Sequence, residues 1–258
     1  MDIKITRVYT SLQERFGVRT VAGAGWTMHF GRLVVPTTHK DKLCAQDTYN
    51  ARTEDNPSIE FSDGGRELLM LDAVHGQYLV TRSGWRMKCN NEGEGVVVTS
   101  PAGTAYTMSA LNTLNNHWSW YTTHIEDLHH NTIDIAYKTT GNLIYIDKIT
   151  ASDGRRLVSF FYEDEGTFDI RLSRIVANGQ TWIYRYESVD TLGALNYYYL
   201  SEVVRPDGLR WRYRYYPFNS GQDAAGNYSM QSVTYPYGAN ITYTYTKVDF
   251  DPWNVDGQ

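Results

Sequence analysis

Aromatic and aliphatic residues alternate strictly with polar residues in several short segments of this chain. The clearest segment follows Gly208, where three arginines alternate with three aromatic residues: Arg210, Trp211, Arg212, Tyr213, Arg214 and Tyr215. Only a β-strand sorts such a pattern onto two faces, because a helix would distribute both kinds of side chain around its axis. The segment is therefore predicted to be a strand with one aromatic face and one charged face.

The same pattern recurs after five turn residues, which are separated by 24, 25, 29 and 30 residues: His130, Gly154, Gly179, Gly208 and Gly238. Apolar residues stand three, five and seven positions after four of them: Ile133, Ile135 and Tyr137; Trp182, Tyr184 and Tyr186; Trp211, Tyr213 and Tyr215; Ile241, Tyr243 and Tyr245. After Gly154 these offsets hold Leu157, Ser159 and Phe161, and the tyrosine, Tyr162, comes one residue late. A β-bulge would absorb the additional residue. Spacings of this size indicate a repeat architecture.

The turns have the residues that tight turns require. In Pro206-Asp207-Gly208, proline sets φ and glycine takes the position where φ can be positive. Asn178-Gly179 is the dipeptide most typical of a two-residue hairpin. The alternative is a single meander whose hairpins are similar by coincidence, but their recurrence in phase favours true repetition. We therefore predict antiparallel hairpins that turn at or next to six residues: Gly103, His130, Gly154, Gly179, Gly208 and Gly238.

No segment shows a sustained helical period, so the chain is predicted to be all-β. Weaker hairpins are expected at 59–70 and 95–108, and a polar, turn-rich loop is expected over 36–57. The predicted organisation has three parts: an N-terminal β-rich region over 1–117, hairpin repeats over 118–246, and a tail or the start of an insertion over 247–258. Since no capping segment follows the last repeat, we expect a longer parent protein.

Composition excludes some functional classes. The chain has 258 residues, of which 21 are tyrosines and 7 are tryptophans. Its formal net charge of −5 argues against binding of nucleic acid through the overall electrostatic field of the molecule. The arginine row that starts at Arg210 is interpreted as a solvated strand face rather than a phosphate-binding ladder. No apolar run approaches the roughly 20 residues of a membrane helix. The first 25 residues contain no apolar core of a signal peptide.

No catalytic motif, metal site or cofactor site is predicted. The densest cluster of potential ligands is formed by three histidines: His124, His129 and His130. They are interpreted as surface residues, since a metal site would need Asp127 or a distant carboxylate in addition. The run from Glu163 to Gly166 is interpreted as a solvated turn, with a calcium site as the alternative. No nucleophile stands at working distance from a base in the sequence.

Cys44 and Cys89 are the two cysteines, too few for a disulfide framework or a zinc site of the Cys-pair kind. Two interpretations remain open for them. They bridge each other if the compartment is oxidising, or they are two reduced structural thiols.

Several of these segments together resemble the RHS/YD-repeat family. They are 120–137 with Ile125-Glu126-Asp127, 205–215 with Pro206-Asp207-Gly208, and 233–245. Gly25-Trp26 is similar to the segment that opens the family's repeat region, and 223–227 is similar to its Asp-x-x-Gly-Asn turns. The resemblance implies a long antiparallel β-sheet that curves into a hollow shell. In better-known members, such as polymorphic toxins and Tc-toxin components, this shell encloses a C-terminal toxin domain, whereas animal teneurins use a similar shell in adhesion.

This chain lacks the Asp-Pro-x-Gly-Leu segment that accompanies shell closure and self-cleavage in the family, and it lacks a variable toxin domain. The expectation is therefore a non-enzymatic shell segment, secreted or on the cell surface as part of a longer protein. Its partners would be the rest of the shell and an effector domain. The alternative is a module that binds a glycan or a protein through exposed aromatic residues, and a third interpretation is a hydrolase on a β-scaffold. We also expect that the chain self-associates through the uncharged, β-prone edge at Ile241–Tyr245 or that its own tail folds over this edge.

Overall fold

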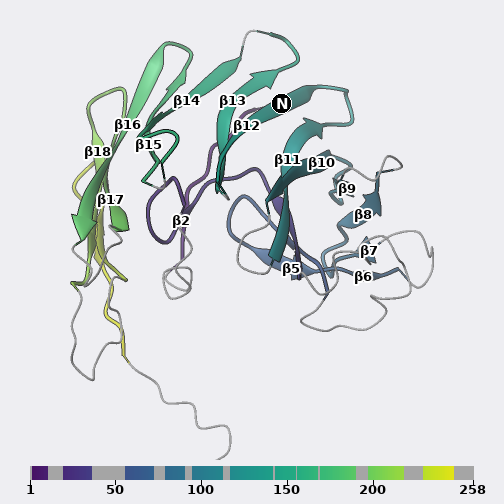
Figure 1. Ribbon diagram of the computed structural model, residues 1–258, viewed down its shortest axis with the longest axis horizontal. Helices are drawn as coiled ribbons and strands as arrows, with labels where there is room; N and C mark the ends of the chain where they lie inside the picture. The colour runs from purple at the N-terminus through teal and green to yellow at the C-terminus, as the bar shows by residue number, and fades with distance from the viewer. Residues whose placement is uncertain are drawn as a thin grey trace, which may run out of the picture.

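The computed structural model is an all-β molecule in which successive strands follow one another around an arc (Figure 1). The structure describes eleven stretches of the chain: 2–10, 20–36, 56–72, 79–90, 95–112, 117–141, 143–154, 156–167, 169–189, 197–217 and 229–246. Across these residues there is no helix, so none is available to cross a membrane. Residues 37–55 of the predicted loop, and the segments 223–227 and 247–258, lie outside the described residues.

Twenty strands are present in these residues. The first half contains β1 (Val8–Tyr9), β2 (Trp26–Thr27), β3 (Arg32–Pro36), β4 (Ser58–Glu60), β5 (Arg66–Leu68), β6 (Met70–Leu71), β7 (Leu79–Val80), β8 (Arg86–Cys89), β9 (Val96–Thr99) and β10 (Ala105–Asn112). The second half contains β11 (His117–Glu126), β12 (Thr132–Thr140), β13 (Leu143–Ala151), β14 (Leu157–Glu163), β15 (Arg171–Ala177), β16 (Gln180–Val189), β17 (Tyr197–Val204), β18 (Arg210–Tyr215), β19 (Met230–Thr234) and β20 (Asn240–Thr242).

All six predicted hairpins are present and antiparallel: β9–β10, β11–β12, β13–β14, β15–β16, β17–β18 and β19–β20. The turn that lacks glycine is made by His130, whose φ of 59° is in the left-handed region that glycine usually occupies. In the two-residue turn, Asn178 and Gly179 both have positive φ, at 51° and 74°. This is the geometry that matches the twist of the flanking strands. The all-β prediction and its hairpin architecture are confirmed.

The repeat after Gly154 departs from the sequence interpretation. In the regular turns the main-chain N–H of one residue donates a hydrogen bond to the carbonyl of the fourth residue after it. An example is Arg205 N–H, which donates to the Leu209 carbonyl at 2.8 Å. At Gly154 the corresponding bond runs from Ala151 N–H to the Arg156 carbonyl at 3.1 Å and spans one residue more. The additional residue is therefore absorbed by a longer turn and not by a bulge in strand β14.

The side chains of β14 confirm this shift. The inward positions are those of Val158, Phe160 and Tyr162, which belong to the core. Leu157 and Phe161, which were assigned to the apolar face by their offset from Gly154, are instead 48% and 38% exposed. A one-residue shift moves every side chain of a strand to the other face, because the period of the pleat is two.

Strands β3 to β11 close into a ring. Strand β3 pairs with β4 on one side and with residues 117–121 of β11 on the other. The rest of β11, at residues 124–126, pairs instead with β12, from which the sheet continues as an open strip to β20. Leu33, Ile59 and Met87 are among the residues that fill the ring, forming a cluster here called the ring core.

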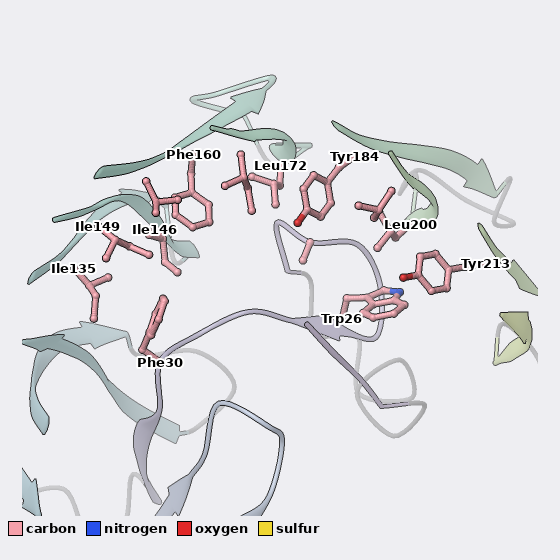
Figure 2. Close-up of a cluster of buried hydrophobic side chains, with 14 of the residues drawn as sticks. Trp26, Phe30, Ile135, Ile146, Ile149, Phe160, Leu172, Tyr184, Leu200 and Tyr213 are labelled. Atoms are coloured by element: carbon pink, nitrogen blue, oxygen red, sulfur yellow. The ribbon is translucent and has the colours of Figure 1, made fainter. Parts of the chain in front are cut away.

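A second cluster, here called the strip core, lies on the concave side of the open strip (Figure 2). It combines inward residues of the strip, such as Ile149, Leu172 and Leu200, with Trp26 and Phe30 from the N-terminal part of the chain. The described N-terminal residues 2–10 and 20–30, here called the N-terminal strap, run across the concave side of the arc (Figure 1). The concave side of the sheet is thus partly filled by the chain itself.

Candidate functional site: the concave face of the sheet

The repeat tyrosines on the concave face share one hydrogen-bonding role. Tyr137, Tyr162, Tyr215 and Tyr245 each donate their hydroxyl to a main-chain carbonyl on the preceding strand. The acceptors are, in the same order, Thr122 at 2.8 Å, Ile146 at 2.5 Å, Leu200 at 2.8 Å and Met230 at 2.9 Å. We call this set of contacts the tyrosine series.

Each acceptor stands next to a β-bulge. The bulges lie in the strand pairs β10–β11, β12–β13, β14–β15, β16–β17 and β18–β19, and in each pair the later strand carries one residue without a partner in the register. These residues are Thr123, Asp147, Ser173, Ser201 and Gln231. The residue before the extra one is the tyrosine's acceptor in four of the five cases. A bulge interrupts the ladder of main-chain hydrogen bonds, and buried carbonyls need a donor. The tyrosine hydroxyl supplies a donor at each of these four irregularities.

Tyr186 is the exception, and the N-terminal strap explains it. The carbonyl of Val21 accepts from Leu172 N–H at 2.7 Å and from the Tyr186 hydroxyl at 3.5 Å. The strap therefore enters the series at the place where the regular contact would lie. Burial raises the pKa of Tyr137, Tyr162 and Tyr186 well above that of a free phenol. Burial therefore favours the protonated hydroxyl, which is the form that donates.

The aromatic triplets lie as their alternation predicts. Trp182, Tyr184 and Tyr186 all contact the strip core, and so do the three equivalent residues of β18. The last copy is different, because β20 pairs only with β19 among the described strands. Tyr243 and Tyr245 are accordingly 38% and 37% exposed.

The strap is attached to the strip by main-chain and side-chain contacts. Ala24 N–H donates to the Tyr198 carbonyl at 2.9 Å. Gly23 has a φ of 99°, and a Cβ there would lie 3.0 Å from Leu200 N, so only glycine permits this approach. The Trp26 ring meets Tyr213 edge-on at 4.8 Å (Figure 2). Its Nε1–H donates to the Tyr215 hydroxyl at 2.8 Å.

A cleft of about 830 Å³ remains between the strap and the strip. Strap residues 2–7 form one wall. The opposite wall comes from β14 to β18, and Trp182, Tyr184 and Trp211 contribute aromatic surface to it. Trp182 and Trp211, which open the aromatic triplets of two repeats, therefore line one cavity, although they are 29 positions apart in the sequence.

Arg7 is the cation next to these aromatic residues. One guanidinium nitrogen lies 3.4 Å from the Tyr213 hydroxyl, and the Cζ atom lies 5.5 Å from the centroid of the Tyr184 ring. Within the described part of the chain, the Arg7 side chain forms no ion pair with a carboxylate. A half-buried guanidinium with only a phenol and an aromatic ring as partners retains unused capacity to bind an anion.

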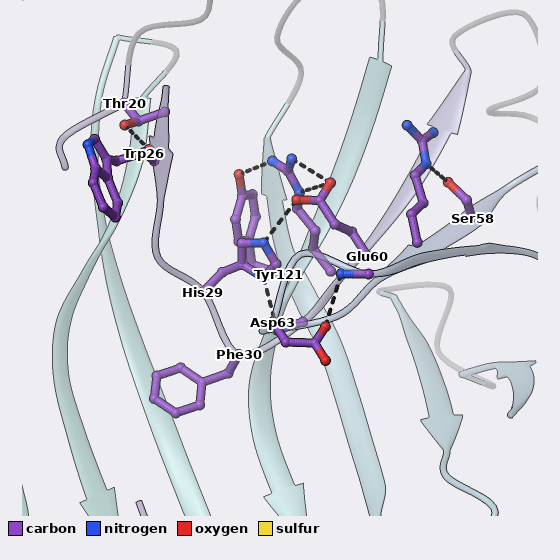
Figure 3. A network of polar contacts seen from close by, with 12 residues as sticks. Thr20, Trp26, His29, Phe30, Ser58, Glu60, Asp63 and Tyr121 are labelled. Carbon is purple, nitrogen blue, oxygen red and sulfur yellow. Dashed lines mark hydrogen bonds and ion pairs between the residues drawn. The ribbon is translucent and has the colours of Figure 1, made fainter. Parts of the chain in front are cut away.

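A second polar group, which the sequence interpretation missed, lies where the strap meets the ring (Figure 3). His29 Nε2 is 3.1 Å from Glu60 Oε1, and Arg32 Nη2 is 2.8 Å from Glu60 Oε2. Arg32 also donates to the Tyr121 hydroxyl at 2.7 Å. We call His29, Arg32, Glu60 and Tyr121 the junction cluster.

The protonation of the junction cluster follows from its contacts. Gly31 N–H donates to His29 Nδ1 at 3.1 Å, so Nδ1 is an acceptor and Nε2–H donates to Glu60. Burial lowers the pKa of His29, which keeps the ring neutral. His29 and Arg32 hold the pKa of Glu60 at about 2, against the burial that opposes its ionisation. The polar groups satisfy one another within the protein, so the cluster is a brace between strap, β3, β4 and β11.

The sequence offered no direct signal for the junction cluster. Its members are spread over 93 positions, from His29 to Tyr121. Only the pairing of β3 with β4 and with β11 brings them together, through the Arg32–Glu60 and Arg32–Tyr121 pairs of the register.

The remaining candidate residues lie apart from the concave face. His124 contacts Asp134 at 2.6 Å and His130 contacts Glu126 at 2.5 Å, while Asp127 accepts from the main chain of its own turn. Glu163 and Asp164 both pair with Arg171. Among the described residues, no three His, Cys, Asp or Glu side chains are grouped closely enough to hold a metal ion.

Arginines of the row on β18 form ion pairs on the convex side of the sheet. Arg210 and Arg212 lie 3.2 and 3.3 Å from Glu202 Oε1, and Arg185 lies 3.1 Å from Oε2 of the same carboxylate. Exposed ion pairs of this kind contribute little to stability. Cys89 is disulfide-bonded, and Cys44, the other cysteine of the sequence, lies outside the described residues.

Comparison with known proteins gives no family assignment. No protein-family model and no curated protein matches the chain. Among solved structures it is similar to a chain of TcdB2-TccC3-Cdc42, with 12% identity and a TM-score of 0.47, over 78% of this chain and 14% of that chain. It is also similar to the N-terminal domain of effector protein SpvB from Salmonella typhimurium, with 12% identity, a TM-score of 0.38 and 94% of both chains covered.

A third similar structure is a porin-like protein from Bacteroides uniformis, with 13% identity and a TM-score of 0.36, over 84% of this chain and 98% of that chain. At these identities and TM-scores the three similarities carry no functional inference. The function must therefore be inferred from the residues of this chain.

Proposed function

We propose that this chain is a structural segment of an RHS/YD-type shell, in which the concave face of the sheet holds a polypeptide guest such as an effector domain. The observation that carries this proposal is the tyrosine series. The same hydroxyl contact joins the two strands of four hairpins, and the same bulge lies where each hairpin from β11–β12 to β19–β20 pairs with the preceding one. Successive hairpins are therefore built and joined in the same way. A wall built by such repetition needs no catalytic residue and extends by adding hairpins.

Two further features fit a scaffold. Aromatic side chains gather on the concave face, whereas charged side chains such as Arg185, Arg210 and Arg212 lie on the convex face. The disulfide at Cys89 fits an oxidising environment, as in a secreted or cell-surface protein. We propose that the chain acts there as part of a longer protein, that it is not an enzyme, and that its partners are neighbouring shell segments and the guest.

Binding of an unfolded polypeptide tests the guest-holding role. The probe is fluorescently labelled, reduced and carboxymethylated α-lactalbumin, whose binding to the chain is measured by fluorescence anisotropy. Trp182→Ser and Trp211→Ser should each weaken binding by roughly tenfold or more, because buried tryptophans dominate such contacts. Ile183→Ser is the matched control, since Ile183 neighbours Trp182 on β16 but is 40% exposed on the convex side. Absence of binding, or equal loss in the Ile183 variant, would contradict the proposal.

A second function, glycan binding, is favoured by one specific observation. Trp182 and Trp211 line the same cleft, and stacked aromatic rings are a common way to hold sugars. A glycan panel measured on the same variants distinguishes the two functions. Specific binding of one glycan that depends on both tryptophans, without affinity for the unfolded polypeptide, would favour the binding module over the shell segment.

A further inference from the structure

We propose that the cleft beneath the N-terminal strap selects extended peptide segments in which acidic residues alternate with apolar ones. This inference rests on the proposed guest-holding function and specifies which part of a guest the concave face binds. It rests on the shape of the cleft, on its apolar walls and on two cations, Lys4 and Arg7, that form no ion pair with a carboxylate of the described residues.

The walls of the cleft suit apolar side chains. Ile3 and Ile5 of the strap face the cleft from one side, and Val158, Ile175 and Val203 of the strip line the other. The strap itself shows that this surface accommodates a chain segment, because residues 2–7 line the cleft without belonging to a strand. A guest segment of extended chain can therefore use the same wall, with alternate side chains directed to it.

The charges around the cleft are predominantly positive. Four cations line it, namely Lys4, Arg7, Arg156 and Arg205, against a single carboxylate, Asp2. Arg156 is neutralised by Asp153 and Arg205 by Asp207, both at 2.9 Å. Lys4 and Arg7 have no ion pair with a carboxylate of the described residues.

Arg7 is the decisive group. Its neighbours are the neutral hydroxyl of Tyr213 and the ring of Tyr184, both of which belong to the buried core. A carboxylate would be a stronger partner than a phenol, because charge-assisted hydrogen bonds are about twice as strong as neutral ones. An acidic side chain set between apolar ones would satisfy Arg7 and leave the tryptophans in contact with apolar surface.

Paired peptides test the charge requirement. One short fluorescein-labelled peptide alternates aspartate with leucine, and its partner replaces each aspartate by asparagine at the same length and shape. In fluorescence anisotropy at low salt, the acidic peptide should bind the full chain roughly tenfold more tightly than its amide partner. This preference should decrease as ionic strength rises, since part of it is electrostatic.

Variants locate the effect. Arg7→Gln should reduce the preference for the acidic peptide to near unity, whereas Arg7→Lys should retain most of it. Arg205→Gln is the matched control, because Arg205 lines the same cleft but is already paired with Asp207. Circular dichroism of each variant shows whether the sheet is intact. If Arg7→Gln fails to fold, Arg7→Met, which removes the charge and keeps a long side chain, replaces it and should lose the preference in the same way.

The outcomes separate this inference from the proposed function. If the unfolded polypeptide binds through Trp182 and Trp211 while both peptides bind equally, or while neither peptide binds, charge selection is wrong and the scaffold proposal stands. If the preference persists undiminished in Arg7→Gln, the assignment to Arg7 is overturned. If neither the polypeptide nor the peptides bind, both proposals fail.

Discussion

At the scale of single residues, the tyrosines of the repeats act through their hydroxyls as much as through their rings. A phenylalanine would fill the same apolar position but would leave the carbonyl beside the bulge without its donor. A buried carbonyl without a partner loses its hydrogen bond to water and gains none in return. This explains why tyrosine stands at each of these positions, even in the displaced copy at Tyr162.

Tyr215 provides the sharpest test of this role. Its hydroxyl donates to the Leu200 carbonyl and accepts from Trp26 Nε1–H, so Tyr215→Phe leaves two buried groups without that partner. We expect the free energy of unfolding to fall by about 2–3 kcal/mol, measured by chemical denaturation. Tyr237→Phe is the control, since Tyr237 is 81% exposed and should change stability little. Equal stability of both variants would show that only the rings matter.

The junction cluster makes stability depend on pH through His29. Because burial lowers its folded pKa below the ordinary value of 6.5, the unfolded chain binds this proton more strongly. The stability contribution is therefore complete above pH 6.5 and is lost as the pH falls from that value towards the folded pKa. Glu60 acts in the same direction at lower pH: its contribution is present above pH 4.5 and is lost as the pH falls towards its folded pKa of about 2.

We accordingly expect the melting temperature to fall as the pH is lowered from about 7.5 to about 5. His29→Gln should reduce this dependence, because glutamine keeps a donor for Glu60 but does not titrate. The measurement is thermal unfolding followed by circular dichroism at a series of pH values. His130→Gln makes the same replacement at an exposed turn position outside the junction cluster and is the control. An unchanged slope in His29→Gln would contradict the role given to the cluster.

At the scale of elements, the strand edge at β20 differs from the rest of the strip. Among the described strands it has one neighbour, β19, and its residues Asn240 to Thr242 are all exposed. Ile241, the central residue of this strand, is 42% exposed. An uncharged, exposed edge without proline is a template for pairing with another chain.

The isolated chain should therefore self-associate through this edge. Light scattering over a concentration series should show oligomers that the double variant Thr242→Lys with Thr244→Lys converts to monomers, because buried ammonium groups oppose strand pairing. Thr139→Lys makes the same kind of substitution once, at an exposed position of β12 away from the edge, and should leave association unchanged. A parent chain that stays monomeric at high concentration would show that the edge is not adhesive.

At the scale of the whole molecule, the N-terminal strap connects the open strip to the closed ring. It contributes Trp26 and Phe30 to the strip core and continues through the junction cluster into β3, which completes the ring. The strip alone would expose the apolar side chains that the strap now covers. The strap is therefore a structural component of the sheet and also the wall of its cleft.

Removal of the Trp26 side chain tests this coupling. Trp26→Ala should cost about 3–5 kcal/mol, since it leaves a cavity in the strip core and deprives Tyr215 of a donor. In hydrogen exchange, amides of β15 to β19 should lose protection more than those of β4 to β9. Trp85→Ala is the matched control, because Trp85 packs with Phe61 and Tyr106 beside the ring core. Uniform loss of protection in both variants would argue against a separate role for the strap.

The sequence by itself determined the local architecture of this protein. Period-two alternation and turn residues depend only on a few neighbouring positions of the sequence. The aromatic face of β16 and β18 was therefore predictable, and so were the hairpins at Gly103, His130, Gly179, Gly208 and Gly238. The copy after Gly154 was predictable as a hairpin, but the face of the sheet on which each side chain of its second strand lies was not. A longer turn and a β-bulge both shift the tyrosine by one residue in the sequence, although they place the side chains on opposite faces.

Only the tertiary structure decided what lies on the concave face. The path of residues 2–30 across the strip, the closure of β3 onto β11 and the meeting of His29 with Glu60 depend on contacts between distant segments, for which one sequence carries no local signal. The same is true of the cleft that brings Arg7 to Trp182 and Trp211. Hydrogen bonds and packing between such segments form only when the chain has folded, and it is there that the candidate site lies.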